Sequence, residues 1–468
     1  MRYLTIIFLI ISFLWWVLLL VSIFVSPPRF NSRGSGFFDF AYTCLTIGNL
    51  LVATIFFITP AKGLRITTAI IAMLLAVDMI LILSVPRLRL EEGWIGIASV
   101  VWAFIMAVWC ILTDRVVAYG KKEEEERLTG RAESRRTLKE WLAVLAATVL
   151  TVVFIVIVVL MTATLGMRAR DSTLKMYGDR ILVDGDKYAV HLACIGNVTE
   201  TGGQRDATVI LEAGENPLEY DLEHWAYSAF RNGTISRYCY WDRPGYAFSD
   251  NAPSPHSAGM SADALSEALA KQGEEGPYIL VAAGTGSIVA RIFSSRHLKQ
   301  VTGLLFVDPF HEDLLHQLAS PSRGFLLWAW GVISPLGTVR LAGAVFKGRT
   351  REDRVYGRNA YQSGKFIKAQ LQENLVADSL TKSEVVSARN IQSSNTPLVV
   401  MSSGIEVGKS SEWERKQEDL STLTDNLVAW DTISGAPHEV WQTLKGRAAM
   451  EKRLRQLVKA ASKVQMAE

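Results

Sequence analysis

Five long apolar runs fill the first 165 positions of this 468-residue chain and limit what it can fold into. Each is close to the ~20 residues that a helix needs to cross a bilayer. The first is too long for the apolar part of a signal peptide, so we interpret it as a retained anchor. The sequence predicts a transmembrane domain of five helices over residues 1–165. Its apolar runs lie at about Leu4–Val25, Phe40–Ile58, Ile66–Val85, Trp94–Leu112 and Trp141–Leu165.

The basic residues predict the orientation of these helices. The segment Asp114–Glu140 carries eight Lys and Arg residues, and loops rich in basic residues stay in the cytoplasm. Counting outward from this loop places the N-terminus in the cytoplasm and everything after Leu165 on the opposite side of an integral membrane protein. A net charge of +3, with no basic stripe interleaved with aromatic residues, indicates no nucleic-acid partner.

Two further features favour an extracytoplasmic C-terminal domain. Asn197 and Asn232 each begin an Asn-x-Thr acceptor for glycosylation. Of four cysteines, Cys194 and Cys239 lie outside the expected spans. A disulfide between them would fit an oxidising compartment, although two buried free thiols fit the spacing equally well. We favour the secretory pathway, with the mitochondrial inner membrane as the alternative.

Asp78 lies near the middle of the third run. A carboxylate in a membrane span is a functional hypothesis by default, because its charge is costly to bury in lipid. Thr46 and Asn49 in the second run are candidate partners. One acid without a matching base favours a hydrogen bond between helices over a proton or ion path, and the absence of paired, interrupted helices argues against a transporter.

After residue 165 the pattern changes to short β-rich runs that alternate with helical stretches. A hairpin is expected around Asp184-Gly185, between the runs Arg180–Val183 and Lys187–Ala193. Strands alternating with helices predict a parallel sheet covered on both faces. The other predicted strands are Ala207–Leu211, Ile235–Trp241, Tyr278–Ala282, Gly303–Asp308 and Pro397–Ser402, and the predicted helices include Met260–Gln272 and Ser287–Lys299.

Residues 309–396 contain no run typical of a strand and predict an inserted helical cap. The part Gly324–Phe346 is apolar enough for a sixth span, but Pro335, Gly337 and Arg340 interrupt it. A crossing there would also place the last strand on the wrong side of the membrane. We interpret this part as a lid that could lie against the bilayer surface. The cap would divide an α/β core into residues 166–308 and residues 397–468, which hold the last strands and the C-terminal helix.

The stretch Leu280–Arg291 (LVAAGTGSIVAR) reads like the strand, sharp turn and helix that carry a catalytic serine in the form small-x-Ser-x-small. The small residues are Ala282 and Gly286, and the central position is Gly284. Glycine tolerates the turn because it adopts a positive φ without strain. It has no atom that can attack a carbonyl, so the nucleophile is missing.

Three ordered motifs accompany this turn: Cys194–Gly196 (CIG), Glu212–Gly214 (EAG) and Asp242–Asp250 (DRPGYAFSD). With them, residues 180–460 resemble the α/β-hydrolase superfamily, particularly its membrane-linked members. The resemblance implies an α/β-hydrolase fold with a helical cap, preceded here by the five transmembrane helices, which it does not cover. It also implies a disulfide between Cys194 and Cys239.

The resemblance assigns the catalytic positions unevenly. Gly284 stands at the nucleophile position, and His438 matches the final histidine before the last helix. Glu406, which follows the penultimate strand, is the nearest candidate for the catalytic acid. Asp308 ends an earlier strand in a Val-Asp-Pro that is mostly structural in the family. His438 itself has a second interpretation as a packed, hydrogen-bonded residue.

The oxyanion donors implied by the resemblance are the backbone N–H of Thr285 and one just after Gly214. There Glu215 would put negative charge where an oxyanion should form. Ser287, three residues after Gly284, could not replace the nucleophile unless the turn were rebuilt. Both observations argue against standard acyl transfer.

The first of three functional hypotheses is a membrane-anchored, catalytically degenerate hydrolase-like protein that binds an apolar or lipid-like ligand or a partner. The second is an active hydrolase for an ester or lipid-like substrate, in which His438 and an acid activate water. The third is a scaffold that assembles a membrane complex. The motifs imply no cofactor and no metal, and they name neither the ligand nor a protein partner.

Overall fold

The computed structural model describes residues 1–30, 32–57, 59–130, 137–201 and 204–465. Ile58 and residues 131–136 of the basic loop, which entered the sequence analysis, lie outside these ranges. The chain forms two compact units. The first, which we call the helical unit, contains Met1–Leu174 and Ala329–Thr350; the second, the α/β unit, contains Lys175–Trp328 and Arg351–Glu468. The expected cap over 309–396 therefore contributes to both units.

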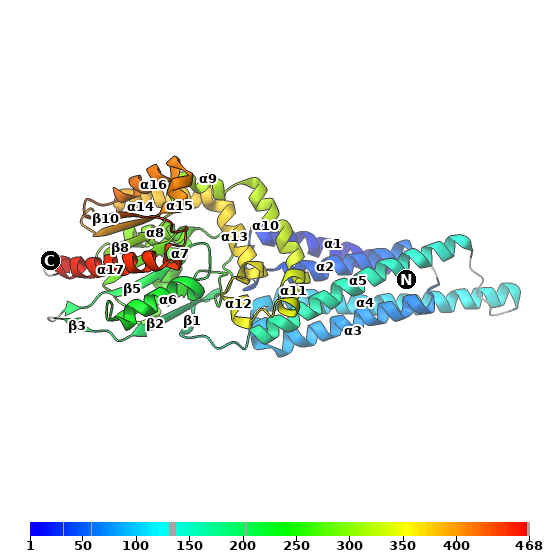
Figure 1. The fold of residues 1–468 in the computed structure, drawn as a ribbon. Coiled ribbons are helices and arrows are strands. Elements are labelled where there is room, and N and C mark those ends of the chain that lie inside the picture. Colours follow the sequence, from blue (N-terminus) through cyan, green and yellow to red (C-terminus); the bar gives the residue numbers. More distant parts are fainter. Residues whose placement is uncertain (31, 58, 131–136, 202–203, 466–468) are drawn as a thin grey trace. The chain divides into compact units, whose positions relative to one another are not determined.

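The helical unit contains five helices that are long and apolar enough to cross a membrane, each coinciding with one of the apolar runs (Figure 1). α4 extends well beyond its apolar run and is interrupted at Gly93, whose φ is 62°. The helices are α1 (Arg2–Phe24), α2 (Phe37–Ile55), α3 (Lys62–Ser84), α4 (Pro86–Thr129) and α5 (Leu138–Asp171).

Ion pairs join the two longest of these helices near the end of α5. The Arg168 guanidinium lies 2.9 Å from a carboxylate oxygen of Glu91 and 2.6 Å from one of Glu92. The two glutamates adjoin the interruption of α4 at Gly93. Because all three side chains are largely buried, each charge depends on the others for compensation.

Asp78 is fully buried in α3 and accepts a hydrogen bond from the Tyr42 hydroxyl of α2 at 3.0 Å. The expected partners do not take this place. Thr46 donates to the backbone carbonyl of Tyr42 instead, and Asn49 lines a separate hollow. The Tyr42–Asp78 contact joins two helices, which is the structural role that the sequence favoured.

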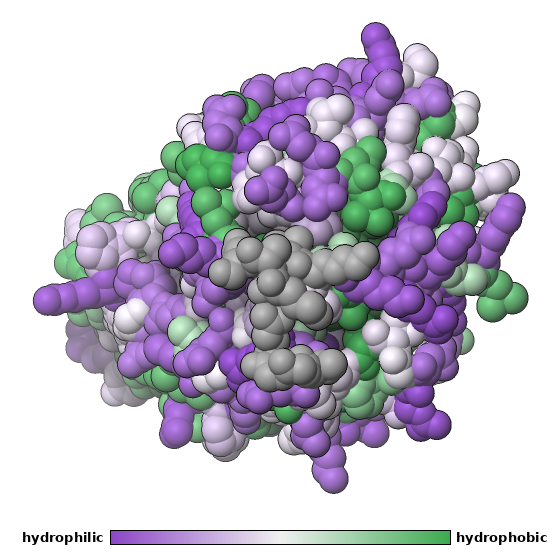
Figure 2. Space-filling view, turned by 90° about the vertical axis from the view of Figure 1, so that its left-hand side faces the viewer, coloured by the Kyte–Doolittle hydropathy of each residue, from purple (hydrophilic) through white to green (hydrophobic). Residues whose placement is uncertain are grey.

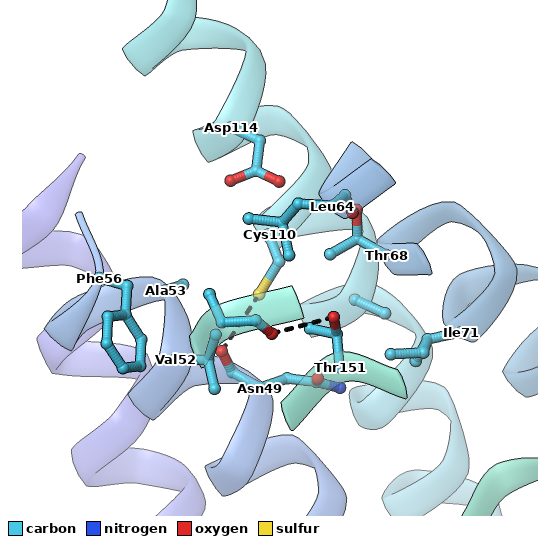
Figure 3. A pocket seen from close by; sticks show the side chains of 12 residues that line it. Asn49, Val52, Ala53, Phe56, Leu64, Thr68, Ile71, Cys110, Asp114 and Thr151 are labelled. Carbon is cyan, nitrogen blue, oxygen red and sulfur yellow. Dashed lines mark hydrogen bonds between the residues drawn. The ribbon is translucent and has the colours of Figure 1, made fainter. Parts of the chain in front are cut away.

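That hollow, of about 450 Å³, lies among α2, α3, α4 and α5 (Figure 3). Polar groups face it from several helices, whereas Val52, Phe56 and Ile71 supply apolar walls. The polar residues that line it are Asn49, Thr68, Cys110, Asp114 and Thr151.

An eight-stranded sheet forms the centre of the α/β unit (Figure 1). β1 and β6 pair antiparallel with β2, and the remaining neighbours are parallel. This topology confirms the predicted α/β-hydrolase fold. In spatial order the strands are β1 (Asp179–Val183), β2 (Tyr188–Gly196), β6 (Arg237–Asp242), β5 (Thr208–Glu212), β7 (Tyr278–Ala283), β8 (Val301–Val307), β9 (Leu398–Ser403) and β10 (Leu427–Ile433).

The predicted hairpin is present as β1 and β2, joined at Asp184 and Gly185, which both have positive φ. Two further short strands, β3 (Glu200–Thr201) and β4 (Gln204–Arg205), pair antiparallel in a separate sheet. β10 lies within residues 397–468, where the sequence predicts a strand after Pro397–Ser402 without locating it.

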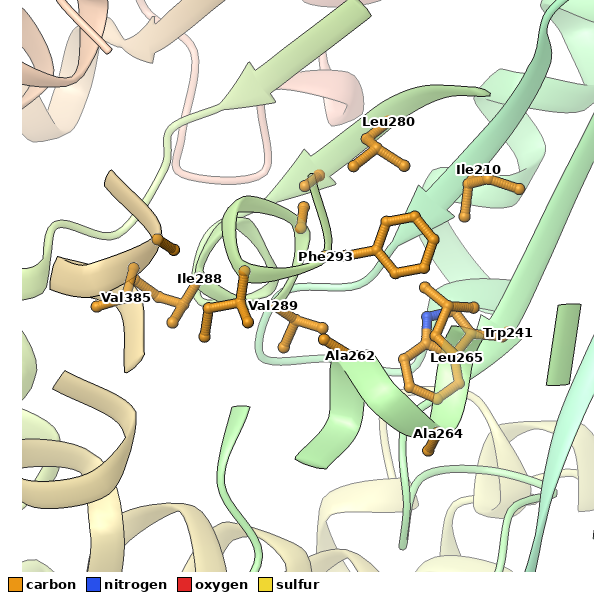
Figure 4. Packing of buried hydrophobic residues seen from close by; sticks show 14 of the residues in the cluster. Ile210, Trp241, Ala262, Ala264, Leu265, Leu280, Ile288, Val289, Phe293 and Val385 are labelled. Atoms are coloured by element: carbon orange, nitrogen blue, oxygen red, sulfur yellow. The ribbon is translucent and has the colours of Figure 1, made fainter. Parts of the chain in front are cut away.

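Alternating side chains of the buried strands form two cores, because successive residues of a strand point to opposite faces. On one face, Ile210, Leu280 and Trp241 pack with Phe293 and Leu265 (Figure 4). That face is covered by α7 (Ala258–Gln272), α8 (Gly286–Arg296), α14 (Lys382–Ile391) and α16 (Ser411–Ser421). The other is covered by α6 (Leu218–Arg231) and α17 (Leu444–Gln465).

All of residues 309–396 are described, and they form helices without a strand, as predicted. The helices are α9 (Leu315–Leu318), α10 (Pro321–Ile333), α11 (Thr338–Phe346), α12 (Arg351–Val355), α13 (Gly364–Val376) and α14, and α15 (Gly404–Lys409) follows β9. The face of the α/β unit in Figure 2 is mainly hydrophilic, unlike the outer surfaces of the five apolar helices.

Candidate active site

Four residues from four different loops meet at the carboxyl ends of the parallel strands. Glu215 follows β5, Gly284 lies between β7 and α8, Asp308 follows β8, and His438 follows β10. In open α/β sheets this edge is where ligands bind. The fold therefore brings the residues that the resemblance assigned to one place, with the exception of Glu406.

The turn at Gly284 has the backbone form of a nucleophile turn without the nucleophile. Its φ is +45°, and its carbonyl accepts hydrogen bonds from the Ser287 hydroxyl at 2.7 Å and the Phe310 N–H at 3.0 Å. Ser287 is fully buried by these contacts, so it does not offer a substitute nucleophile. A Cβ at Gly286 would lie 2.0 Å from the Ala213 carbonyl oxygen, which explains the small residue there.

His438 is oriented by Asp308 in the manner of a catalytic histidine and its acid. Nδ1 of His438 lies 2.6 Å from Oδ2 of Asp308. Oδ1 of Asp308 accepts hydrogen bonds from the Ser403 N–H at 2.9 Å and the Trp413 indole N–H at 3.0 Å. Since Asp308 is fully buried, these bonds fix its carboxylate and, through it, the imidazole ring.

Glu406 does not occupy the acid position that the sequence analysis gave it. It lies in the first turn of α15, and its carboxylate forms an ion pair with Lys409 at 2.7 Å. Asp308 holds His438 instead. The physical reason is that Asp308 follows β8 directly at the ligand-binding edge, whereas Glu406 is carried away from it by the short helix after β9.

The Glu215 carboxylate occupies the place where a nucleophile and an oxyanion would meet. Its Oε2 lies 3.1 Å from Nε2 of His438, and its Oε1 accepts the backbone N–H of Thr285 at 3.2 Å. A Cβ built at Gly284 would lie 2.6 Å from Oε2 of Glu215 and 2.8 Å from Nε2 of His438. The carboxylate therefore uses both the expected oxyanion donor and the histidine nitrogen that would activate a serine.

The charges of this group stabilise one another. Burial disfavours the charged form of His438, but its hydrogen bonds to Asp308 and Glu215 outweigh it and raise the pKa of His438 to about 11. Burial also opposes the charge of Glu215, yet the His438 hydrogen bond and charge keep the pKa of Glu215 below its ordinary value. At neutral pH the arrangement is an imidazolium held between two carboxylates.

Arg243 of the Asp-Arg-Pro-Gly-Tyr motif positions the loop that carries Glu215. Its guanidinium donates to the Gly214 carbonyl and to the Tyr246 hydroxyl, and it lies 4.6 Å from the centre of the Tyr246 ring. The motif that contains Arg243 carried only the resemblance, and no role for Arg243 was predicted. Arg243 lies far from Glu215 in the chain, so the sequence offered no signal for this contact.

A hollow of about 280 Å³ opens beside Glu215. Its apolar wall is formed by Pro217, Leu222, Ala283 and Trp441. The Asn216 amide donates to Glu439 at 3.1 Å across its rim.

The remaining assigned residues lie away from this group. Cys194 and Cys239 face each other in β2 and β6 and form the disulfide that the resemblance implied. Asn197 and Asn232 are both exposed, and the Asn232 amide donates to Glu451 of α17 at 3.2 Å.

Comparison with known proteins places this architecture in a family. A family model described as a region of unknown function (DUF2417) matches residues 1–194, which include the five apolar helices and the first hairpin of the sheet. An uncharacterized protein of Schizosaccharomyces pombe is 33% identical over 480 residues, covering 96% of this chain and 89% of that protein. An uncharacterized vacuolar membrane protein of Saccharomyces cerevisiae is 26% identical, covering 59% of this chain and 50% of that protein.

Solved structures of α/β hydrolases are similar to the second half of the chain. One from a deep-sea metagenome library has a TM-score of 0.42 and 11% identity, covering 59% of this chain and 96% of its own. The structure of DBJA has a TM-score of 0.45 and 13% identity, covering 62% of this chain and 99% of its own.

Sheet topology defines an α/β-hydrolase fold, in a chain that also carries five apolar helices. Within that class, the chain belongs to the same family as the fission-yeast protein, with which it shares nearly its whole length.

Proposed function

We propose that this protein is a membrane-anchored, catalytically degenerate α/β-hydrolase-like protein that binds a lipid-like or apolar ligand at the former active site. The observation that carries the proposal is the Glu215 carboxylate, bound by His438 Nε2 at 3.1 Å and the Thr285 N–H at 3.2 Å. Standard acyl transfer needs a nucleophile and an empty oxyanion site, and this carboxylate fills the space of both.

The charge state of His438 supports the loss of catalysis. A general base works best when its pKa lies near the operating pH. With its pKa raised to about 11 by Asp308 and Glu215, after burial is overcome, the imidazole already holds its proton at neutral pH. It therefore cannot take one from water or from a hydroxyl while Glu215 stays in place.

Binding of an apolar group is supported by the hollow beside Glu215. Pro217, Leu222, Ala283 and Trp441 give it an apolar wall, and Glu215 and Glu439 are the carboxylates that line it. The five apolar helices place the chain at a membrane, where lipid is the abundant apolar molecule. A ligand in the hollow would meet Glu215 at one end and apolar side chains along its length.

Photoactivatable lipid tests this proposal in the full chain. We expect a diazirine-bearing monoacylglycerol to label peptides around Leu222 and Trp441, and Asn216→Trp, at the rim, to reduce this labelling about tenfold or more. Asn390→Trp, an exposed residue of α14, is the matched control and should label like the wild type. Equal labelling of both variants, or none in these peptides, would contradict the proposal.

The alternative is an active hydrolase that uses His438, favoured by the short contact of 2.6 Å between His438 and Asp308. It requires Glu215 to leave His438 so that the imidazole can activate water on an ester or lipid-like substrate. Turnover of such esters by the wild type, lost on His438→Ala, would support this alternative over a binding role.

We also propose that the N-terminus is cytoplasmic and the α/β unit extracytoplasmic, in a membrane of the secretory pathway. The basic residues of the segment Asp114–Glu140, several of which lie in the extension of α4, support this orientation, as do the Cys194–Cys239 disulfide and the exposed Asn197 and Asn232. The budding-yeast relative is a vacuolar membrane protein. Endoglycosidase should increase the gel mobility of the wild type. An Asn197→Gln/Asn232→Gln variant should not respond, and an unresponsive wild type would count against lumenal exposure.

A further inference from the structure

A bent helical segment of the helical unit adds to its five long helices. We call residues 329–349 the bent segment; it contains the end of α10, the short helix Ser334–Leu336, and α11. α10 and α11 are bent by 55° at this connection. Each alone is shorter than the ~20 residues that a span requires, since α10 has 13 residues and α11 has 9. Together they are long and apolar enough for a broken span or a re-entrant loop, so length alone does not exclude a crossing.

Two glycines bring this segment into close contact with the long helices. A Cβ at Gly331 would lie 2.0 Å from the Phe37 ring, and one at Gly337 would lie 2.1 Å from the Thr164 hydroxyl. Small residues at such crossings are typical of helix packing in membranes. Arg340 completes the contact by pairing with Asp171 at 3.4 Å. The bent segment is therefore fixed to the helices and is not a free loop.

These contacts set the level of the bent segment relative to the bilayer. Phe37 is the first residue of α2, and Thr164 lies one residue before the end of the apolar run of α5. Because successive spans alternate in direction, the start of α2 and the end of α5 lie at the same membrane surface. That surface is also the one from which the chain continues into the sheet.

The sheet excludes a crossing by this segment. β8 precedes it and β9 follows it, yet the two strands pair in parallel, with Leu304 opposite Leu398. Both ends of the segment must therefore lie on the same side of the membrane. A segment that touches the helices at the bilayer surface and returns to that side lies at the interface.

The exposed side chains of the bent segment are apolar, as contact with lipid requires. Between residues 329 and 346 the only charged residue is Arg340, which is buried. A helix face turned to water normally carries several charges. Here the exposed side chains are Trp330, Ile333, Val339, Val345 and Phe346, with Phe346 84% exposed. Lys347 and Arg349 follow at once.

We propose that the bent segment is an interfacial membrane element, with its apolar face among the acyl chains of the leaflet next to the α/β unit and Lys347 and Arg349 at the phospholipid headgroups. Amphipathic helices bury such a face about 5–10 Å into the boundary between headgroups and acyl chains. The lipid-facing surface of the five helices thereby continues onto the cap insertion. The inference does not depend on a ligand beside Glu215.

Depth-dependent quenching tests this inference on the full chain in phosphatidylcholine vesicles. Single cysteines labelled with an environment-sensitive fluorophore would be introduced by Phe346→Cys, Val339→Cys and Lys347→Cys, with Cys44 and Cys110 replaced by alanine. Glu275→Cys is the matched control, because its side chain is also 84% exposed but lies in the α/β unit.

We expect a spin label on the acyl chain to quench probes at 346 and 339 several times more than aqueous iodide does, and the opposite order at 275. The probe at 347 should respond most to a spin label on the headgroup. Iodide quenching at 346 equal to that at 275 would overturn the inference. So would a probe at 347 that lies deeper in the acyl region than the probe at 339, since residue 347 would then not lie at the headgroups.

Discussion

Replacing Glu215 by alanine and Gly284 by serine in the same chain is expected to create a serine that reacts with a fluorophosphonate probe. The other catalytic groups are in place. Asp308 orients His438 at 2.6 Å, and the Thr285 N–H becomes available once Glu215 no longer accepts its hydrogen bond. Removing the serine of such a triad costs on the order of 10⁶-fold in kcat. We therefore expect labelling of the double variant to exceed that of the wild type by ~10³-fold or more.

The two single variants show separately how the missing nucleophile and the Glu215 carboxylate each prevent labelling. Gly284→Ser alone should label little, because its Cβ would lie 2.6 Å from Oε2 of Glu215 and the carboxylate would still hold His438. Glu215→Ala alone should not label, since it provides no nucleophile. Adding His438→Ala to the double variant should abolish its reactivity. Labelling of the wild type that disappears on Ser287→Ala would refute this account of the site.

The pKa of His438 should fall by at least one unit in a Glu215→Gln variant. Asp308 remains in that variant, so the pKa should stay above its ordinary value of 6.5, whereas in the wild type it is raised to about 11 against the effect of burial. Nitrogen chemical shifts of isotope-labelled histidine, assigned with His438→Gln, measure this directly. Glu439→Gln is the matched control, because Glu439 accepts from Asn216 and leaves the His438 contacts unchanged.

The raised pKa of His438 in the wild type also determines how the free energy of unfolding depends on pH. Between about 6.5 and 11 the folded chain holds a proton on His438 that the unfolded chain releases, so the free energy of unfolding decreases as pH rises through this window. The lowered pKa of Glu215 stabilises the folded chain at neutral pH, and this stabilisation is lost as pH falls below about 4.5. Wild-type protein whose His438 titrates near 6.5 would contradict both statements.

The parts of the fold that the sequence predicted are those with an unambiguous pattern. Five apolar runs of membrane length coincide with five helices, and buried strands such as Tyr278–Ala283 are continuous apolar runs. The position of β10 was not identified because it lies at the edge of the sheet and is mostly half-exposed. Its sequence, LVAWDTI, contains an aspartate that a buried strand would not carry.

The site was harder to predict because its members are far apart in the chain. The sequence identified Gly284, His438 and the unfavourable charge of Glu215, since each stands in a recognisable motif. It favoured Glu406 over Asp308 as the acid, which is wrong, because each follows a buried strand and only the path of the chain after β9 separates them. Nor could it show that the Glu215 carboxylate reaches His438 Nε2, which depends on the loop that Arg243 holds.

The position of the bent segment in the chain has a consequence for biosynthesis. Asp308 is synthesised before it and His438 after it, while β9 and β10, which complete the sheet, also come later. Residues 329–349 are therefore synthesised, and available to pack against the helices, before β9, β10 and His438 are part of the chain. The His438–Asp308 contact consequently forms only in a chain whose bent segment is already complete.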